Sequence, residues 1–399
     1  MRRIGLLPRL IIGLVSGIVI GYLCSIAGVE WPVRLLATFN SLFGGFLSYI
    51  IPFIILGYVA YGIADLQKDA GKLLLLTVVI AYVSTIIAGL FAFGGATLLL
   101  PGLAGDRSAE NPEHALLTAF FTVEMPPLMG VMTALITAFV LGVGMAAIRS
   151  QTMLSFMKEF EAIISKVIHN IIIPLLPIHI GGIFANMTFS GQVWNTMVVF
   201  GQVFAVIIGM HLIFIVAQFV VASGIAGRNP VRALRNMLPA YVTAVGTQSS
   251  AATIPVTLRC AKKNVSDDVA DFVIPLCATI HLSGSTITVT TCAMAIMYMS
   301  GMTASFDQIM PFILMLGITM VAAPGVPGGA IMAALGLLSS MLGFSEAQLA
   351  LMIALYLTQD SFGTATNVTG DGAIAIIIDW FAKRKVAATE KLAMPTGAE

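Results

Sequence analysis

Charged side chains are scarce in this sequence, and their scarcity argues against most classes of soluble protein. Only 10% of the 399 residues are Asp, Glu, Lys or Arg, whereas 58% are apolar. Soluble domains carry about 25% charged residues, so the solvent around most of this chain must be a lipid bilayer. The 20 basic and 19 acidic residues leave a net charge of +1. This balance gives no electrostatic reason to expect a nucleic acid as partner.

Cysteine is rare as well, and its spacing indicates neither a disulfide framework nor a metal site. The cysteines lie singly inside apolar runs, without the paired spacing that such sites need. We therefore interpret them as small residues of the core. They are Cys24, Cys260, Cys277 and Cys292.

Long apolar runs are what the sequence has in abundance. A helix needs about 20 apolar residues to cross a bilayer. The runs predict an all-α polytopic membrane protein with eight transmembrane helices. The expected spans are 10–29, 42–64, 72–100, 120–148, 167–189, 194–224, 271–300 and 346–380.

Two further apolar runs, 236–258 and 308–343, are interrupted by glycine, proline and small polar residues. Lys and Arg are retained on the cytoplasmic side of short loops. If both runs turn back as re-entrant helical hairpins, 18 of the 20 basic residues and both termini are cytoplasmic, against 15 otherwise. We therefore predict two hairpins in an inverted repeat, a pattern typical of secondary transporters with a binding site at the bilayer midplane. Two kinked spans are the alternative.

The last span carries polar side chains on one helical face. At about 100° per residue, Asp360, Thr364, Asn367 and Asp371 fall close together around the helix. A carboxylate at the bilayer centre costs roughly 2.5 kcal/mol or more. Asp360 and Asp371 are therefore candidates for a functional site.

The span 271–300 is rich in hydroxyl residues and contains one histidine. Gly284, beside His281 and Ser283, permits a break in the helix, and a break frees carbonyl oxygens that a cation can use. Thr279 and Ser285 belong to the same polar group. His281 is either a hydrogen-bonded structural residue or a proton carrier.

The turn of the first hairpin carries Gln248, Ser249 and Ser250. Backbone N–H groups and hydroxyls in such a turn form a concavity that binds anions. A carboxylate is therefore an expected ligand at this tip.

Three motifs resemble those of the dicarboxylate/amino-acid:cation symporters, the glutamate-transporter homologues. They are Ser249-Ser250-Ala251-Ala252-Thr253-Ile254-Pro255, Gly325-Val326-Pro327-Gly328 and Asn367-Val368-Thr369-Gly370-Asp371. The resemblance implies a glutamate-transporter-like fold and a homotrimer in the cell inner or plasma membrane, whose transport core moves like an elevator through a fixed scaffold. It divides the chain into a six-span N-terminal half (1–225), a transport core (226–386) and a disordered cytoplasmic tail (387–399).

The same resemblance implies which residues hold the cargo. The hairpin serines and Asn367 would hold an α-carboxylate, Asp360 an amino group, and Asp371 a sodium ion. The implied substrate-binding residues are Gln248, Ser249, Ser250, Ser285, Val326, Pro327, Gly328, Asp360, Gly363, Thr364 and Asn367. The implied sodium-binding residues, some acting through backbone carbonyls, are Cys277, Thr279, His281, Asn367 and Asp371. An additional cation site is implied at Ser84, Thr85 and Ser283.

Departures from the family's pattern change the expected substrate. Members that carry acidic substrates have an arginine and a bracing aspartate where this chain has Gly363 and Tyr356. The chain is more similar to the sodium/serine-threonine branch, which implies a symporter of small neutral amino acids. Ser283 replaces the acid of one sodium site, so we expect about two transported sodium ions and no organic cofactor.

Other functions remain open at this point. One alternative is a symporter of the same fold that carries a dicarboxylate with sodium or protons. Another is an anion channel, because some members of the family conduct anions. An intramembrane aspartyl protease would need carboxyl groups about 3 Å apart. Asp360 and Asp371 are about 16 Å apart along one helix, so we expect no enzyme.

Overall fold

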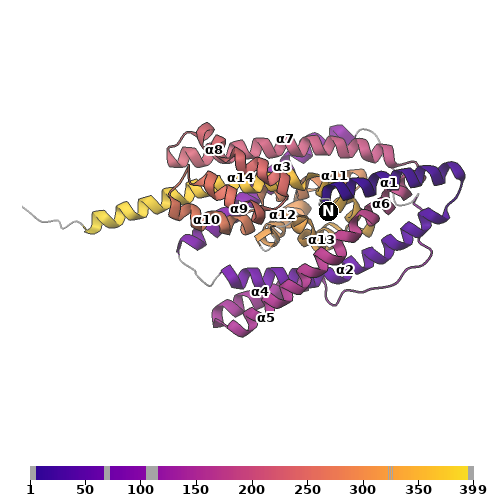
Figure 1. The fold of residues 1–399 in the computed structure, drawn as a ribbon, viewed down its shortest axis with the longest axis horizontal. Coiled ribbons are helices and arrows are strands. Elements are labelled where there is room, and N and C mark those ends of the chain that lie inside the picture. The colour runs from indigo at the N-terminus through magenta and orange to yellow at the C-terminus, as the bar shows by residue number, and fades with distance from the viewer. Residues whose placement is uncertain are drawn as a thin grey trace, which may run out of the picture.

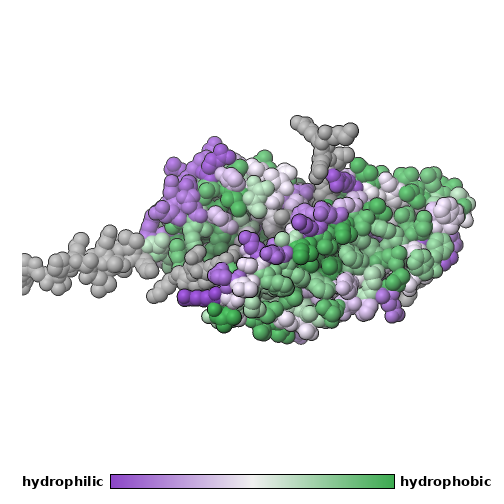
Figure 2. All heavy atoms as spheres, turned by 60° about the horizontal axis from the view of Figure 1, so that its bottom comes forward, coloured by the Kyte–Doolittle hydropathy of each residue, from purple (hydrophilic) through white to green (hydrophobic). Residues whose placement is uncertain are grey.

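The computed structural model describes residues 6–66, 72–104, 116–321, 323, 325 and 327–393. Within these ranges the regular structure is helical and no strand occurs, which confirms the predicted all-α fold class. Six helical segments of the described chain are long and apolar enough to cross a membrane. Figure 2 shows hydrophobic side chains over much of the face in view, and hydrophilic ones gathered most densely toward one end.

The helices of the N-terminal half are long because the apolar runs that form them are long. α5, the π turn η2 and α6 follow one another without a break, so the span predicted at 167–189 is the later part of a longer helical segment. These elements are α1 (Leu6–Ala27), α2 (Trp31–Leu66), α3 (Lys72–Ala104), α4 (Val131–Ile148), α5 (Gln151–Val167), η2 (Ile168–Ile172), α6 (Ile173–Phe189) and α7 (Val193–Ala226).

The helices of the C-terminal half are shorter, except the last. Figure 1 shows α14 running through this half and projecting from it at one end. The helices are α8 (Pro230–Thr247), α9 (Ser250–Ala261), α10 (Asp267–Ile280), α11 (Ser283–Met299), α12 (Phe306–Val321), α13 (Gly329–Leu342) and α14 (Glu346–Ala393).

The predicted span 120–148 is wrong at its start. Helix α4 begins only at Val131, and the segment from Leu116 to Gly130 forms no regular helix. Pro126 and Pro127 explain the difference, because a proline lacks the amide hydrogen and disfavours helical geometry in the residue before it.

Two further predictions need correction. The span expected at 271–300 consists of α10 and α11, and the break lies at His281 and Leu282, while Gly284 belongs to the first turn of α11. The tail predicted to be disordered from residue 387 is helical as far as Ala393. The alanine, glutamate, lysine and leucine of this stretch are good helix formers, so they extend α14.

The two interrupted runs fold as pairs of packed helices, α8 with α9 and α12 with α13. Asn229 begins the first pair by accepting a 3.0 Å hydrogen bond from the backbone N–H of Arg232, as an N-cap does. The first helix of each pair ends just before the expected turn, α8 at Thr247 and α12 at Val321. Their re-entry into the bilayer stays a prediction.

Close helix packing in the N-terminal half depends on glycines spaced four residues apart in α1. Gly13, Gly17 and Gly21 face α6, and a Cβ atom at Gly17 would lie only 2.0 Å from the carbonyl oxygen of Gly181. Small residues at such spacing let two membrane helices approach closely. The backbones of α1 and α6 are therefore in direct van der Waals contact at these glycines.

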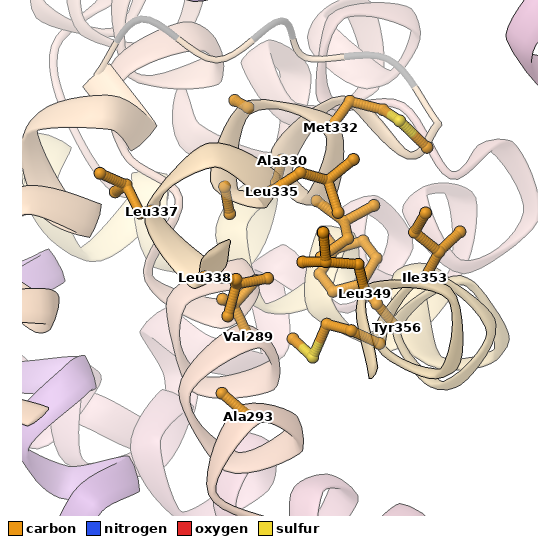
Figure 3. Packing of buried hydrophobic residues seen from close by; sticks show 14 of the residues in the cluster. Val289, Ala293, Ala330, Met332, Leu335, Leu337, Leu338, Leu349, Ile353 and Tyr356 are labelled. Carbon is orange, nitrogen blue, oxygen red and sulfur yellow. The ribbon is translucent and has the colours of Figure 1, made fainter. Parts of the chain in front are cut away.

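The core next to the candidate site is formed by α11, α13 and α14. Figure 3 shows apolar side chains from these helices packed together, among them Val289, Leu338 and Tyr356. All three are 1% exposed or less. This packing fixes α14 against α11, which places the polar side chains described below.

Candidate functional site

The turns of the two helix pairs meet each other. Ser249 donates a 2.8 Å hydrogen bond from Oγ to the carbonyl oxygen of Gly325, and the N–H of Ala251 lies 3.4 Å from the same oxygen. Ser249 also accepts the N–H of Ala252 at 3.2 Å and so caps α9. The turns of the two helix pairs, 76 residues apart in the sequence, are therefore in direct contact.

Other residues predicted at these turns lie around this contact. Gln248 adopts a left-handed conformation with φ 53°, and its Nε2 donates to Ser361 Oγ at 2.8 Å. Ser250 is the first residue of α9 and is buried. Pro327 lies in the turn before α13, whereas Val326 lies outside the described residues.

Asp360 caps the start of α13. Its Oδ2 accepts the backbone N–H of Gly328 at 2.7 Å, and only 4% of the residue is exposed. Gly328 has φ 74°, a left-handed conformation that favours glycine. Thr364, one helical turn after Asp360, is also buried. The carboxylate thus connects α14 with the second turn.

Asn367 caps the start of α11. Its Oδ1 accepts the N–H groups of Gly284 at 2.7 Å and Ser285 at 3.2 Å, and its Nδ2 donates to Ser285 Oγ at 2.9 Å. Tyr356 also donates to this hydroxyl, at 3.2 Å. In this structure both polar atoms of the Asn367 amide therefore bind the residues that follow the break.

His281 and Asp371 form a buried pair on the other side of the break. His281 Nδ1 lies 2.9 Å from Asp371 Oδ1, and its Nε2 lies 3.0 Å from Ser84 Oγ. The neutral tautomer that fits both contacts donates from Nδ1 and accepts at Nε2. The second carboxylate oxygen of Asp371 has no hydrogen-bond partner in the described chain, so it is available to a cation.

Several other predicted cation ligands are not joined to this pair by their side chains. Thr279 is exposed and bonds back to Leu276 O at 2.8 Å, and Thr85 bonds back to Ala81 O at 2.9 Å. The hydroxyl of Ser283 has no partner among the described residues. The buried Cys277 uses its carbonyl to accept the N–H of His281 at 2.9 Å.

Gly363 lies at the contact between α14 and α11. A Cβ at Gly284 would be 2.4 Å from the carbonyl oxygen of Gly363, and a Cβ at Gly363 would be 3.3 Å from Thr288 Oγ1. The residue thus lets two helix backbones approach each other. A large side chain at residue 363 would have to point away from α11.

Two polar residues of α7 were missed by the sequence analysis. His211 Nε2 lies 3.0 Å from the carbonyl oxygen of Gly284, and Gln218 Nε2 donates to Ser84 Oγ at 3.0 Å. They are seven residues apart, about two helical turns, in the stretch 203–222 of α7, which is otherwise apolar. Polar side chains in such a run are the only sequence signal that points to them.

The arrangement brings helix ends of opposite polarity together. The last turn of α10 presents carbonyl oxygens, and a helix C-terminus carries partial negative charge. With the carboxylate of Asp371 beside it, this end suits a cation. The start of α9 at Ser250 presents N–H groups and partial positive charge, which suits an anion.

Comparison with known families agrees with this chemistry. A model of the sodium:dicarboxylate symporter family matches residues 6–381. The match covers nearly the whole chain, and the chain therefore belongs to the sodium:dicarboxylate symporter family. Membership confirms the predicted family and the glutamate-transporter-like fold, and it supports a sodium-coupled membrane transporter of a small molecule.

Proposed function

We propose that this member of the family couples sodium entry to the uptake of small neutral amino acids such as serine, threonine or alanine. The transport core, residues 226–386 with spans of the N-terminal half, would move through the scaffold of a homotrimer whose termini are cytoplasmic. The observation that supports this cargo is a buried acid, Asp360, in a stretch of the core, residues 264–382, that contains no Lys or Arg. About two sodium ions would move with each substrate.

The absence of Lys and Arg bears directly on the charge of the substrate. Neither type occurs between residues 264 and 382, nor in the first interrupted run, 236–258. A dicarboxylate would bring a second negative charge next to Asp360, and an unpaired buried charge costs several kcal/mol. A zwitterion avoids this cost, because its ammonium group compensates the acid.

The ends of a zwitterion match the groups at the two turns. The ammonium would bind Asp360, whose two carboxylate oxygens can accept further hydrogen bonds beside those from Gly328, Tyr356 and Thr364. The α-carboxylate would bind the start of α9 at Ser249 and Ser250. Charge-assisted hydrogen bonds of this kind are about twice as strong as neutral ones.

Asp371 would supply the charge for sodium coupling. Its Oδ2 is buried without a partner in the described chain, and hard cations prefer oxygen ligands. The carbonyl oxygens at the end of α10, next to His281, would complete the coordination. One carboxylate with neutral carbonyls leaves a single sodium ion charge-balanced.

Thermal stabilisation of the purified protein tests the cargo. A ligand that binds only the native state raises the unfolding temperature. We expect L-serine, L-threonine or L-alanine to stabilise the protein in sodium chloride and not in choline chloride. Stabilisation by succinate or L-aspartate alone would contradict the proposal and favour the acidic-substrate alternative.

Asp360→Asn tests the ammonium contact, because it keeps the shape of the side chain and removes the charge. Amino-acid stabilisation should disappear while stabilisation by sodium alone remains. Asp271→Asn is the matched control, since Asp271 lies outside the site and pairs with Lys262 at 2.9 Å. Unchanged amino-acid binding in Asp360→Asn would contradict the assignment.

A further inference from the structure

The break between α10 and α11 is held by side chains from two helices. α14 contributes Asn367, which binds the N–H of Gly284, and Asp371, which binds His281. The second helix is α7, a long, mostly apolar helix that packs against both α11 and α14. Two polar side chains of α7, His211 and Gln218, contact the same segment.

His211 contacts the beginning of α11. The residue is 1% exposed, and its Nε2 lies 3.0 Å from Gly284 O and 3.1 Å from Thr288 Oγ1. A carbonyl oxygen can only accept, so Nε2 carries the hydrogen and donates it. Thr288 donates to the same carbonyl at 3.1 Å.

These two donors occupy the carbonyl of Gly284. Gly284 also lies four residues before Thr288 in α11, so this carbonyl accepts the backbone N–H of Thr288 as well. A cation would therefore have to displace a donor to bind this oxygen. In the last turn of α10 the Cys277 carbonyl accepts the N–H of His281, whereas the carbonyls of the three residues after Cys277 are at the helix end, where an α-helix supplies no further amide partner. These carbonyls are therefore the ones available to a cation.

Gln218 contacts residues beside the C-terminal end of α10. Its Nε2 lies 3.0 Å from Ser84 Oγ and 3.5 Å from His281 Nε2. Ser84 in turn reaches His281 Nε2 at 3.0 Å. Gln218 thus orients the hydroxyl that holds the ring of His281, which contacts Asp371 on its opposite edge.

We propose that His211 is a positioning residue for sodium binding, with Gln218 as its weaker counterpart. His211 fixes the Gly284 carbonyl toward α7 and so keeps the carbonyls at the end of α10 and the carboxylate of Asp371 in place for the cation. The proposal rests on the proposed function, because it assumes that sodium binds at Asp371.

The test measures the sodium concentration that gives half-maximal thermal stabilisation, with ionic strength held constant by choline chloride. His211→Phe keeps the ring and removes the donor, so we expect this concentration to rise about tenfold, as the loss of one buried hydrogen bond predicts. His211→Gln restores a donor at similar reach and should return the value to within about threefold of the wild type. Gln218→Leu should cause a smaller rise, because Ser84 still contacts His281.

Ile207→Ala is the matched control for packing. Ile207 lies one turn before His211 on α7 and is fully buried, so its truncation should lower the unfolding temperature without changing the sodium dependence. An unchanged sodium dependence in His211→Phe, or the same change in Ile207→Ala, would overturn the proposal.

Three further cases are distinguished by the test. If His211→Phe does not fold, His211→Asn replaces it, because the shorter amide cannot reach Gly284 and should raise the sodium requirement, unlike His211→Gln. A wild-type protein that sodium stabilises without L-serine binding would overturn the proposed cargo and leave this inference standing. A wild-type protein that does not respond to sodium would overturn both.

Discussion

The α1–α6 pair and the α11–α14 pair approach each other through glycines in different surroundings. In the first pair, Gly17 faces the backbone of Gly181, and the neighbouring Val15 and Val19 are exposed apolar residues. In the second pair, Gly284 faces the backbone of Gly363. Residues around Gly284 are buried, and many are polar.

The difference shows that close backbone packing serves two purposes in this chain. Between α1 and α6, close packing joins two apolar helices. Lipid tails are as apolar as the helix surfaces, so the attraction comes from van der Waals contact, which small residues allow. Between α11 and α14 it brings Asn367 within 2.7 Å of the Gly284 N–H. Only the second contact carries polar groups into the candidate site.

The largest effect is expected from Gly17→Ala. The new Cβ would lie 2.0 Å from Gly181 O, and backbone atoms cannot move aside as a flexible side chain can. The two helices must separate, which should destabilise the protein by about 3 kcal/mol. Thermal unfolding in detergent measures the loss. The half-saturating sodium concentration of the remaining folded protein should not change, and a change would contradict the separation of the two purposes.

Gly284→Ala makes the same substitution in the second pair. Its Cβ would lie 2.4 Å from Gly363 O, so we expect a destabilisation of about 2 to 3 kcal/mol. Unlike Gly17→Ala, it should also weaken sodium binding at least about tenfold, because the hydrogen bond to Asn367 would lengthen. A pure loss of stability would show that the break tolerates displacement of α11.

Asp379→Ala extends the comparison to the C-terminal part of α14, beyond the candidate site. Asp379 is fully buried and accepts from Arg228 at 2.6 Å, Ser266 Oγ at 2.7 Å and Lys383 at 2.8 Å. Its removal leaves these donors without their acceptor, and we expect a loss of about 2 kcal/mol, since Arg228 and Lys383 remain partly hydrated. Lys383→Ala, at the exposed partner, should cost less than about 1 kcal/mol. Chemical denaturation would compare the two variants.

Much of the fold follows from local patterns in the sequence. Continuous apolar runs predict the long helices, because only a helix satisfies its own backbone in lipid. The spacing of Asp360, Thr364, Asn367 and Asp371 predicts their shared face on the last helix, and α14 is helical throughout this stretch. The interrupted runs predict the two helix pairs.

The remaining features depend on contacts between distant segments. Nothing local in α7 distinguishes His211 from a histidine packed in an apolar core, because its partner at Gly284 is 73 residues away. The same holds for Asn367, whose amide binds the start of α11. The break falls at His281 because Asn367 caps the residues after it, whereas the glycine suggested a position three residues later.

The smallest effect is expected from Gly209→Ala in α7, and its sign should be opposite. A Cβ at Gly209 would meet no atom within 4 Å, so no helix has to move. Alanine is about 0.8 to 1 kcal/mol more favourable than glycine in a helix interior, and the variant should be stabilised by up to about 1 kcal/mol. The unfolding temperature, measured beside Gly17→Ala and Gly284→Ala, checks this. If all three alanines destabilised the protein equally, the close approach of backbones could not be the cause, because only Gly17 and Gly284 face a backbone carbonyl.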